Sequence, residues 1–145
     1  GIVPEPAGLI SPLIQAETFG AIYADYEQYR FNDALVKILG IVDAANKLIN
    51  DEAPWTLAKE EKTERLHDVL YRVLNALRAV AALISPVTPE LAQNMWEQLG
   101  FENDITIANW QQIVETALPV GQKTVPGQPI LPRLESDLVG ADKKK

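Results

Sequence analysis

The amino-acid sequence predicts an all-α protein, a helical bundle of four to five helices that carries a short extended C-terminal tail. Along several segments, apolar residues recur at steps of three and four, the spacing that places side chains on one face of a helix. These segments end near Pro or Gly residues, which break or cap helices. The chain has 145 residues, of which 47% are hydrophobic, so it is long enough to bury a core and too apolar to be disordered.

Four parts follow one another along the chain. The first ten residues contain Pro4 and Pro6 and are expected to form an extended lead-in, and residues 11–118 form the bundle. Residues 119–135 are rich in Gly and Pro, so we expect a non-helical tail that packs on the bundle. Residues 136–145 end in three lysines, and we expect them to be disordered.

Two helices are predicted in the first third of the chain. The first begins with Ser11 as its N-cap and Pro12 as its first helical residue, and it ends near Gln28. Its apolar side consists of Phe19, Ile22, Tyr23 and Tyr26. The second spans about 32–50, and its apolar face consists of Leu35, Ile38, Leu39, Val42, Ala45 and Ile49. Asn46 is placed on the same buried stripe, where its amide either bonds a neighbouring backbone group or contacts a ligand.

The third predicted helix, at about 60–85, shows the clearest apolar pattern. Its stripe consists of Leu66, Val69, Leu70, Val73, Leu74, Leu77, Val80, Ala81 and Ile84. We therefore expect Leu70 and Leu77 to be buried. A fourth helix begins at Thr88 and Pro89 and ends at Gly100, with Pro early and Gly late. A short helix at about 109–115 follows, with Trp110 and Ile113 packing inward.

The most informative stretch is the corner between the second and third helices, Asp51-Glu52-Ala53-Pro54-Trp55-Thr56-Leu57-Ala58-Lys59. Pro54 lacks a backbone donor and restricts the residue before it, so the second helix ends near Asp51. Trp55 then stands at a corner where a core residue is not required. Two interpretations stay open: the indole fills the core, or it is presented to a partner.

The sequence segments around this corner resemble the anticodon-binding domain of methionyl-tRNA synthetases. The matching segments are Phe31-Asn32-Asp33-Ala34-Leu35, Ala45-Asn46-Lys47, Ala53-Pro54-Trp55 and Lys59. Three later segments are also similar to these domains. The turn between the last two long helices is matched by Leu83-Ile84-Ser85-Pro86-Val87-Thr88-Pro89-Glu90-Leu91, and the end of the following helix by Trp96-Glu97-Gln98-Leu99-Gly100. The tail is matched by Pro129-Ile130-Leu131-Pro132-Arg133-Leu134-Glu135. The likeness covers about Tyr29 to Glu135, and Ala53-Pro54-Trp55 with Lys59 points to methionine.

The resemblance implies roles for particular residues. Trp55 would stack on the first anticodon base, with Pro54 shaping the corner that presents it. Lys59 and Arg30 would approach RNA phosphates, although either can equally be a surface charge, and Asn46 would be a further contact. Methionyl enzymes also carry an Asn-x-x-x-Arg helix that hydrogen-bonds anticodon bases. This chain has no equivalent, because Asn75 and Arg78 are three apart and lie in another helix.

As a whole enzyme, the parent protein would join methionine to tRNA using ATP, in the cytoplasm. The His-x-Gly-His and Lys-Met-Ser-Lys-Ser types of nucleotide motif are absent from this sequence, so we expect this chain alone to be inert, without a cofactor. Its expected partners are the tRNA(Met) anticodon loop and the catalytic domain of the same enzyme, with no membrane, and by itself it is expected to be monomeric. Two alternatives remain: the anticodon domain of a valyl, leucyl, isoleucyl or cysteinyl enzyme, or a helical protein-interaction module.

Composition limits the remaining possibilities. The chain contains no cysteine and only His67, so neither a disulfide nor a metal site is expected, and His67 is interpreted as structural. It opens on Gly1, and its only methionine is Met95, so we expect a piece of a longer protein. The net charge is −7, which opposes RNA binding, but single-stranded bases are recognised by stacking and need few cations. The acidic residues are interpreted mainly as solvated helix faces, among them Glu17, Asp25, Glu27, Asp51, Glu52, Glu60, Glu61 and Glu64.

Overall fold

The computed structural model describes residues 1–8 and 12–131, and this part of the chain is helical, which confirms the predicted all-α class. The elements, in order, are α1 (Ala16–Glu27), α2 (Phe31–Glu52), α3 (Pro54–Lys59), α4 (Thr63–Ile84), α5 (Pro89–Gln98), the 3-10 helix η1 (Ile105–Ile107) and α6 (Trp110–Glu115). The expected N-cap at Ser11, the last part of the tail at 132–135 and the segment 136–145 lie outside the described residues.

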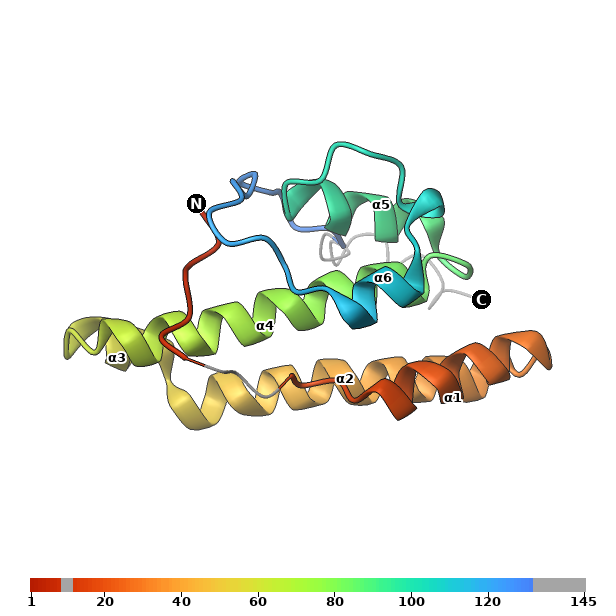
Figure 1. Ribbon diagram of the computed structural model, residues 1–145, viewed down its shortest axis with the longest axis horizontal. Coiled ribbons are helices and arrows are strands. Elements are labelled where there is room, and N and C mark those ends of the chain that lie inside the picture. The colour runs from red at the N-terminus through yellow and green to blue at the C-terminus, as the bar shows by residue number, and fades with distance from the viewer. Residues whose placement is uncertain (9–11, 132–145) are drawn as a thin grey trace, which may run out of the picture.

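Helix α4 lies in the middle of the molecule (Figure 1). The antiparallel pair α1 and α2 packs on one side of it, whereas α5, η1 and α6 pack on the other. The short α3 lies at one end of the long axis, and the turn between α1 and α2 lies at the opposite end (Figure 1). The main core forms where these layers meet, and its side chains without measurable exposure include Ile22, Ala34, Ala81, Leu83 and Ala92.

Two predicted burial patterns are wrong. Leu70 is 38% exposed, because the N-terminal half of α4 is covered by α2 and α3 and not by α5 or α6. Leu77 is only partly buried. On α2, Leu39 and Asn46 are exposed, so the buried face is narrower than the sequence indicated and consists of Ala34, Ile38, Ile41 and Ala45.

The helix boundaries also differ from prediction at two places. Helix α1 begins at Ala16 and not at Pro12, with Gln15 as its N-cap. The expected corner before α4 contains a separate helix, α3, and α4 begins at Thr63.

Three polar side chains on α4 hold α6 and the segment that follows it. The Tyr71 hydroxyl donates to the carbonyl of Leu118 at 2.7 Å, and the Leu118 N–H donates to Asn75 Oδ1 at 3.1 Å. The buried Arg78 donates through Nη2 to the carbonyls of Ile113, at 2.8 Å, and Thr116. Burial lowers the pKa of Arg78. Asn75 and Arg78 therefore contact the chain's own backbone.

The two ends of the described chain pair with each other. Ile2 and Lys123 form an antiparallel bridge, and Val3 exchanges backbone hydrogen bonds with Gln122, at 2.8 Å, and Gly121, at 2.9 Å. Val3 is buried beside Tyr71 and Leu118. None of the helices in the described ranges is long and apolar enough to cross a membrane.

Candidate functional site

The corner between α2 and α3 is built by an unusual backbone conformation. Ala53 adopts φ 43° and ψ 68°, in the left-handed region that residues other than Gly seldom occupy. Pro54 is the first residue of α3, where its missing N–H costs no hydrogen bond. The Ala53 carbonyl accepts the N–H groups of Thr56, at 2.7 Å, and Leu57, at 3.2 Å. The chain therefore reverses sharply and starts α3 at once.

Trp55 projects from this corner into solvent. Its side chain is 56% exposed, whereas Leu57, two residues later, is buried and anchors α3 on α4. Within the described residues the indole takes part in no aromatic pair. An indole exposed to this extent does not fill the core, so the first interpretation of Trp55 is wrong.

The other end of α3 is equally well defined. Lys59 is its last residue and is exposed. Glu61 takes a left-handed φ of 57°, and the Lys62 N–H donates to the Leu57 carbonyl at 3.0 Å, the bond of a Schellman cap. Hydrogen bonds at both ends fix the backbone of this six-residue helix, and with it the point from which the Trp55 side chain leaves the corner.

The carboxylates beside the indole are neutralised locally. Asp51 pairs with Lys47 at 2.5 Å, and Glu52 forms a two-bond pair with Arg65 of α4, one contact being Nε to Oε2 at 2.8 Å. The hydrogen bond from Arg65 lowers the pKa of Glu52, against the opposing effect of burial, so Glu52 is ionised and paired. Each of the two carboxylates that precede the corner therefore has a cation as its partner.

The other residues that the resemblance suggested are scattered. Asn46 lies on the exposed side of α2, about two turns before Trp55's corner, and not on the buried stripe. Arg30 immediately precedes α2, which spans 22 residues, so at 1.5 Å per residue it lies about 33 Å along the axis from that corner. The structure therefore brings Pro54, Trp55 and Lys59 together and leaves Arg30 at the other end.

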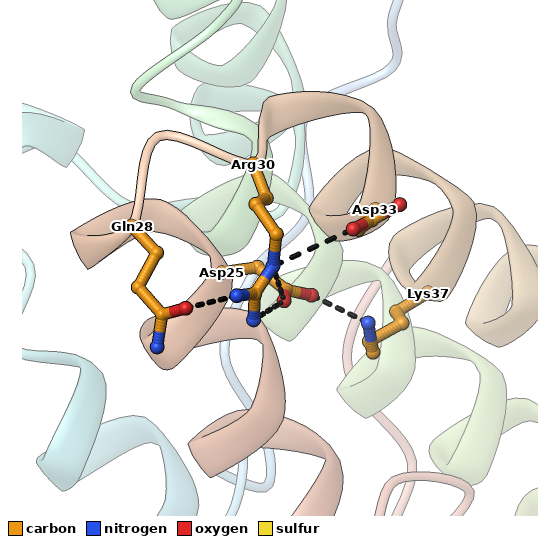
Figure 2. A network of polar contacts seen from close by, with 5 residues as sticks. All are labelled: Asp25, Gln28, Arg30, Asp33 and Lys37. Atoms are coloured by element: carbon orange, nitrogen blue, oxygen red, sulfur yellow. Dashed lines mark hydrogen bonds and ion pairs between the residues drawn. The ribbon is translucent and has the colours of Figure 1, made fainter.

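Arg30 belongs to an ion-pair network that the sequence did not reveal (Figure 2). Asp25, interpreted above as a solvated acid, is only 3% exposed. Its carboxylate accepts Arg30 Nη2 at 2.6 Å and Lys37 Nζ at 2.5 Å, and Arg30 also bonds Gln28 and lies 3.5 Å from Asp33 (Figure 2). The hydrogen bond from Lys37 has the largest effect on the pKa of Asp25, and it holds this pKa below its usual value. The hydrogen bond from Arg30 acts in the same direction, whereas burial opposes both.

We expect Asp25→Asn to weaken the dependence of the free energy of unfolding on pH in the acidic range. Because the pKa of Asp25 is lowered by folding, its ionised form stabilises the fold above the unfolded value of about 3.9, and this contribution is lost as the pH falls through the folded pKa. The variant should lose free energy of unfolding near neutral pH, and its difference from the unsubstituted chain should shrink below about pH 4. Urea unfolding at several pH values measures this. An equal loss at every pH would contradict it, and Asp43→Asn, at an exposed position on α2, is the control.

No group of three or more His, Cys, Asp and Glu side chains in the described part of the chain could hold a metal ion. His67 is a half-buried residue of α4.

Comparison with known proteins identifies the family. Residues 16–129 match the family described as the anticodon-binding domain of tRNA ligase. This chain belongs to that family. The anticodon-binding domain is 39% identical over 120 residues to the methionine–tRNA ligase of a Nostoc species, covering 76% of this chain and 22% of that protein. Over an alignment of 152 positions, it is 34% identical to the methionine–tRNA ligase of Caldanaerobacter subterraneus. This alignment covers 99% of this chain and 24% of that protein.

A solved structure agrees with these relatives. The ligand-free methionyl-tRNA synthetase of Mycobacterium tuberculosis superimposes on the domain with a TM-score of 0.69 and 27% identity, over 93% of this chain and 28% of that one. The resemblance to methionyl-tRNA synthetases is therefore confirmed, and the valyl, leucyl, isoleucyl and cysteinyl alternatives are not favoured. The domain spans about a quarter of the length of the relatives it matches.

Proposed function

We propose that Trp55 stacks on an anticodon base of tRNA(Met), and that this contact lets the rest of a methionine–tRNA ligase attach methionine to its tRNA. The observation that supports this most directly is the exposed indole at a corner fixed by Ala53 and anchored by Leu57. Unpaired anticodon bases offer flat faces, and aromatic stacking recognises them without a large cationic surface.

The charges around the corner fit this role. Asp51 and Glu52 are both paired with cations, so an approaching phosphate meets no free carboxylate from this pair. In this proposal Lys59, four residues after Trp55 on the same short helix, contacts a neighbouring phosphate. Stacking by Trp55 supplies most of the binding in this proposal, and Lys59 adds a salt-dependent part.

The chemistry of aminoacylation belongs to the remainder of the ligase. We assign the use of ATP and methionine to the catalytic domain, and no cofactor or metal to this domain. The working complex is a cytoplasmic ligase in which the anticodon loop and the catalytic domain are the partners of this domain, which is otherwise monomeric.

Trp55→Ala in the full-length ligase is the direct test. Loss of a stacking platform removes about 1–3 kcal/mol per base, which corresponds to a decrease of roughly 5- to 150-fold in kcat/KM for tRNA. Methionine-dependent ATP–pyrophosphate exchange reports a step that precedes tRNA charging, so it should stay nearly constant. Steady-state charging and exchange assays on the same preparation measure both.

Two further variants sharpen this test. Trp55→Phe keeps an aromatic face and should retain most of the charging activity. Val36→Ala removes an exposed apolar side chain from α2 and should change neither assay. If Trp55→Ala folds normally and charges tRNA as well as the unsubstituted enzyme, the anticodon role of Trp55 is wrong.

A further inference from the structure

The ion pair between Glu52 and Arg65 joins two helices at the corner that carries Trp55. Glu52 is the last residue of α2, and Arg65 lies in the first turn of α4. Arg65 donates through Nε to Glu52 Oε2 at 2.8 Å and through Nη2 to Oε1, so the guanidinium and the carboxylate meet edge to edge. Because the two residues are thirteen apart in the sequence, the pair encloses the whole of α3 (Figure 1).

Helix dipoles oppose both charges of this pair. A negative charge is unfavourable at the C-terminal end of a helix, where Glu52 lies, and a positive charge is unfavourable in the first turn, where Arg65 lies. Glu64, the neighbour of Arg65, has the charge that the first turn of α4 favours. Neither helix by itself explains its charged residue. The contact between the two helices explains both.

The position of α3 depends on this contact because little else holds the short helix. A helix of six residues is too short to be stable alone. Its one buried side chain is Leu57, which packs on α4. Its N-cap, Ala53, has a left-handed φ of 43°, and such a backbone is strained and persists only where neighbouring contacts hold it. Glu52, immediately before Ala53, supplies such a contact with α4.

We propose that Glu52 and Arg65 are positioning residues, which hold the end of α2 against the start of α4 and thereby fix the point at which Trp55 meets an anticodon base. This inference rests on the proposed function, because it takes stacking on Trp55 as the contact that the pair serves. Half of the Arg65 side chain is accessible to solvent, and ion pairs of this exposure add little to the stability of a whole fold. The effect of the pair is therefore local to the corner.

Positioning and simple electrostatics predict opposite results for Glu52→Gln. The substitution removes a negative charge and leaves Arg65 without its carboxylate, so charge alone would lower the KM for tRNA. Loss of positioning should instead raise this KM by roughly fivefold, near the lower limit of what a stacked base contributes. The kcat at saturating tRNA should change little, as is usual when binding alone is weakened. Steady-state charging by the full-length ligase measures both constants, and an unchanged or lowered KM would overturn the proposal.

Asp51→Asn is the matched control for charge. Asp51 also has a cation as its partner, but this partner is Lys47, one turn earlier on the same helix. The substitution therefore changes the charge by the same amount as Glu52→Gln without separating α2 from α4. The KM for tRNA should stay constant or fall. An equal increase in KM for the two variants would show that the contact with α4 is not responsible, and the proposal would be wrong.

Exchanging the two charges tests the contact itself. Glu52→Arg alone brings two cations together, so it should raise the KM for tRNA at least as much as Glu52→Gln does. Glu52→Arg combined with Arg65→Glu restores an ion pair and also places each charge where its helix dipole favours it. The combined variant should recover most of the loss in KM. A combined variant that unfolds at the native temperature but keeps the high KM would contradict the proposal.

A double-mutant cycle with Trp55→Ala shows whether the pair acts through the indole. A contribution to general stability would be the same in both backgrounds, because independent effects add. We expect Glu52→Gln to raise the KM for tRNA when Trp55 is present and to have no further effect in the Trp55→Ala enzyme. If Trp55→Ala impairs charging and Glu52→Gln has the same effect in both backgrounds, this inference is wrong and the anticodon role of Trp55 stands.

A measurement without tRNA separates failure of this inference from failure of the proposed function. Fluorine-labelled tryptophan is incorporated into the full-length ligase, and Trp55→Phe identifies the resonance of Trp55 by its loss. Glu52→Gln should shift or broaden this resonance, and Asp51→Asn should leave it nearly unchanged. If the resonance responds in this way although Trp55→Ala charges tRNA normally, positioning is supported and the anticodon role is wrong. If Trp55→Ala impairs charging but Glu52→Gln leaves the resonance unchanged, positioning is wrong.

Discussion

Leu83→Ala is expected to lower the free energy of unfolding by about 2–5 kcal/mol, the usual result of emptying a core leucine site. Leu83 has no exposed surface and lies near the C-terminal end of α4, where α1, α2 and α5 converge on that helix. Its carbonyl also accepts the Tyr26 hydroxyl at 2.7 Å, so the backbone on either side is held and cannot collapse freely into the cavity. Equilibrium urea unfolding followed by circular dichroism measures the change.

Leu70→Ala provides the matched comparison on the same helix. Leu70 is 38% exposed, so removing its side chain leaves no closed cavity, and the loss should stay below about 1 kcal/mol. Both substitutions have the same effect on helix propensity, so the difference between them reports burial alone. A cost at Leu70 equal to or above that at Leu83 would show that the wrong face of α4 had been placed inward.

The contrast between these two leucines shows what hydrophobic spacing determines. The pattern at 66–84 predicted α4 and its length almost correctly, because apolar residues at steps of three and four are a strong helix signal. The pattern did not distinguish the sides of α4, because apolar residues surround more than one face. Which of them are buried depends on where α3, α5 and α6 cover the helix, and that is a tertiary property.

Polar residues were the least predictable. Asp25 follows Ile22 by three residues and therefore shares its helix face, which could have indicated a buried acid. Its partners, Arg30 and Lys37, lie five and twelve residues further on, beyond a turn, so the ion pairs depend on how α2 folds back on α1. Arg78 is a similar case, because the carbonyls that it binds are more than thirty residues away.

The corner between α2 and α3 was predicted in its main feature and not in its detail. Pro54 correctly indicated the end of α2. The sequence did not predict that Ala53 would turn left-handed and allow α3 to begin at Pro54 itself, because alanine is not a residue associated with that conformation. The assignment of Trp55 to an anticodon base remains a prediction until tRNA charging is measured.

Caps of the Schellman type end α1, α3 and α5, with Tyr29, Glu61 and Gly100 at the left-handed position. Gly100 is the residue that this cap normally prefers, since it has no Cβ to strain the backbone. It has a second reason for being glycine. A Cβ built at Gly100 would lie 1.9 Å from the carbonyl oxygen of Lys123, in the segment that pairs with the N-terminal lead-in.

Gly100→Ala is therefore expected to cost about 3 kcal/mol of unfolding free energy, combining left-handed strain with a backbone overlap that only movement of the 121–125 segment can relieve. That movement would weaken the bond from the Val125 N–H to the Gln98 carbonyl, 3.0 Å in the native fold. Gly121→Ala is the matched control, because Gly121 has a φ of 79° and nothing within 4 Å of its Cβ position. Gly121→Ala should lose about 1 kcal/mol of unfolding free energy, because it has the left-handed strain without the backbone overlap. Equal losses for the two variants in urea unfolding would mean that the 121–125 segment does not pack against the end of α5.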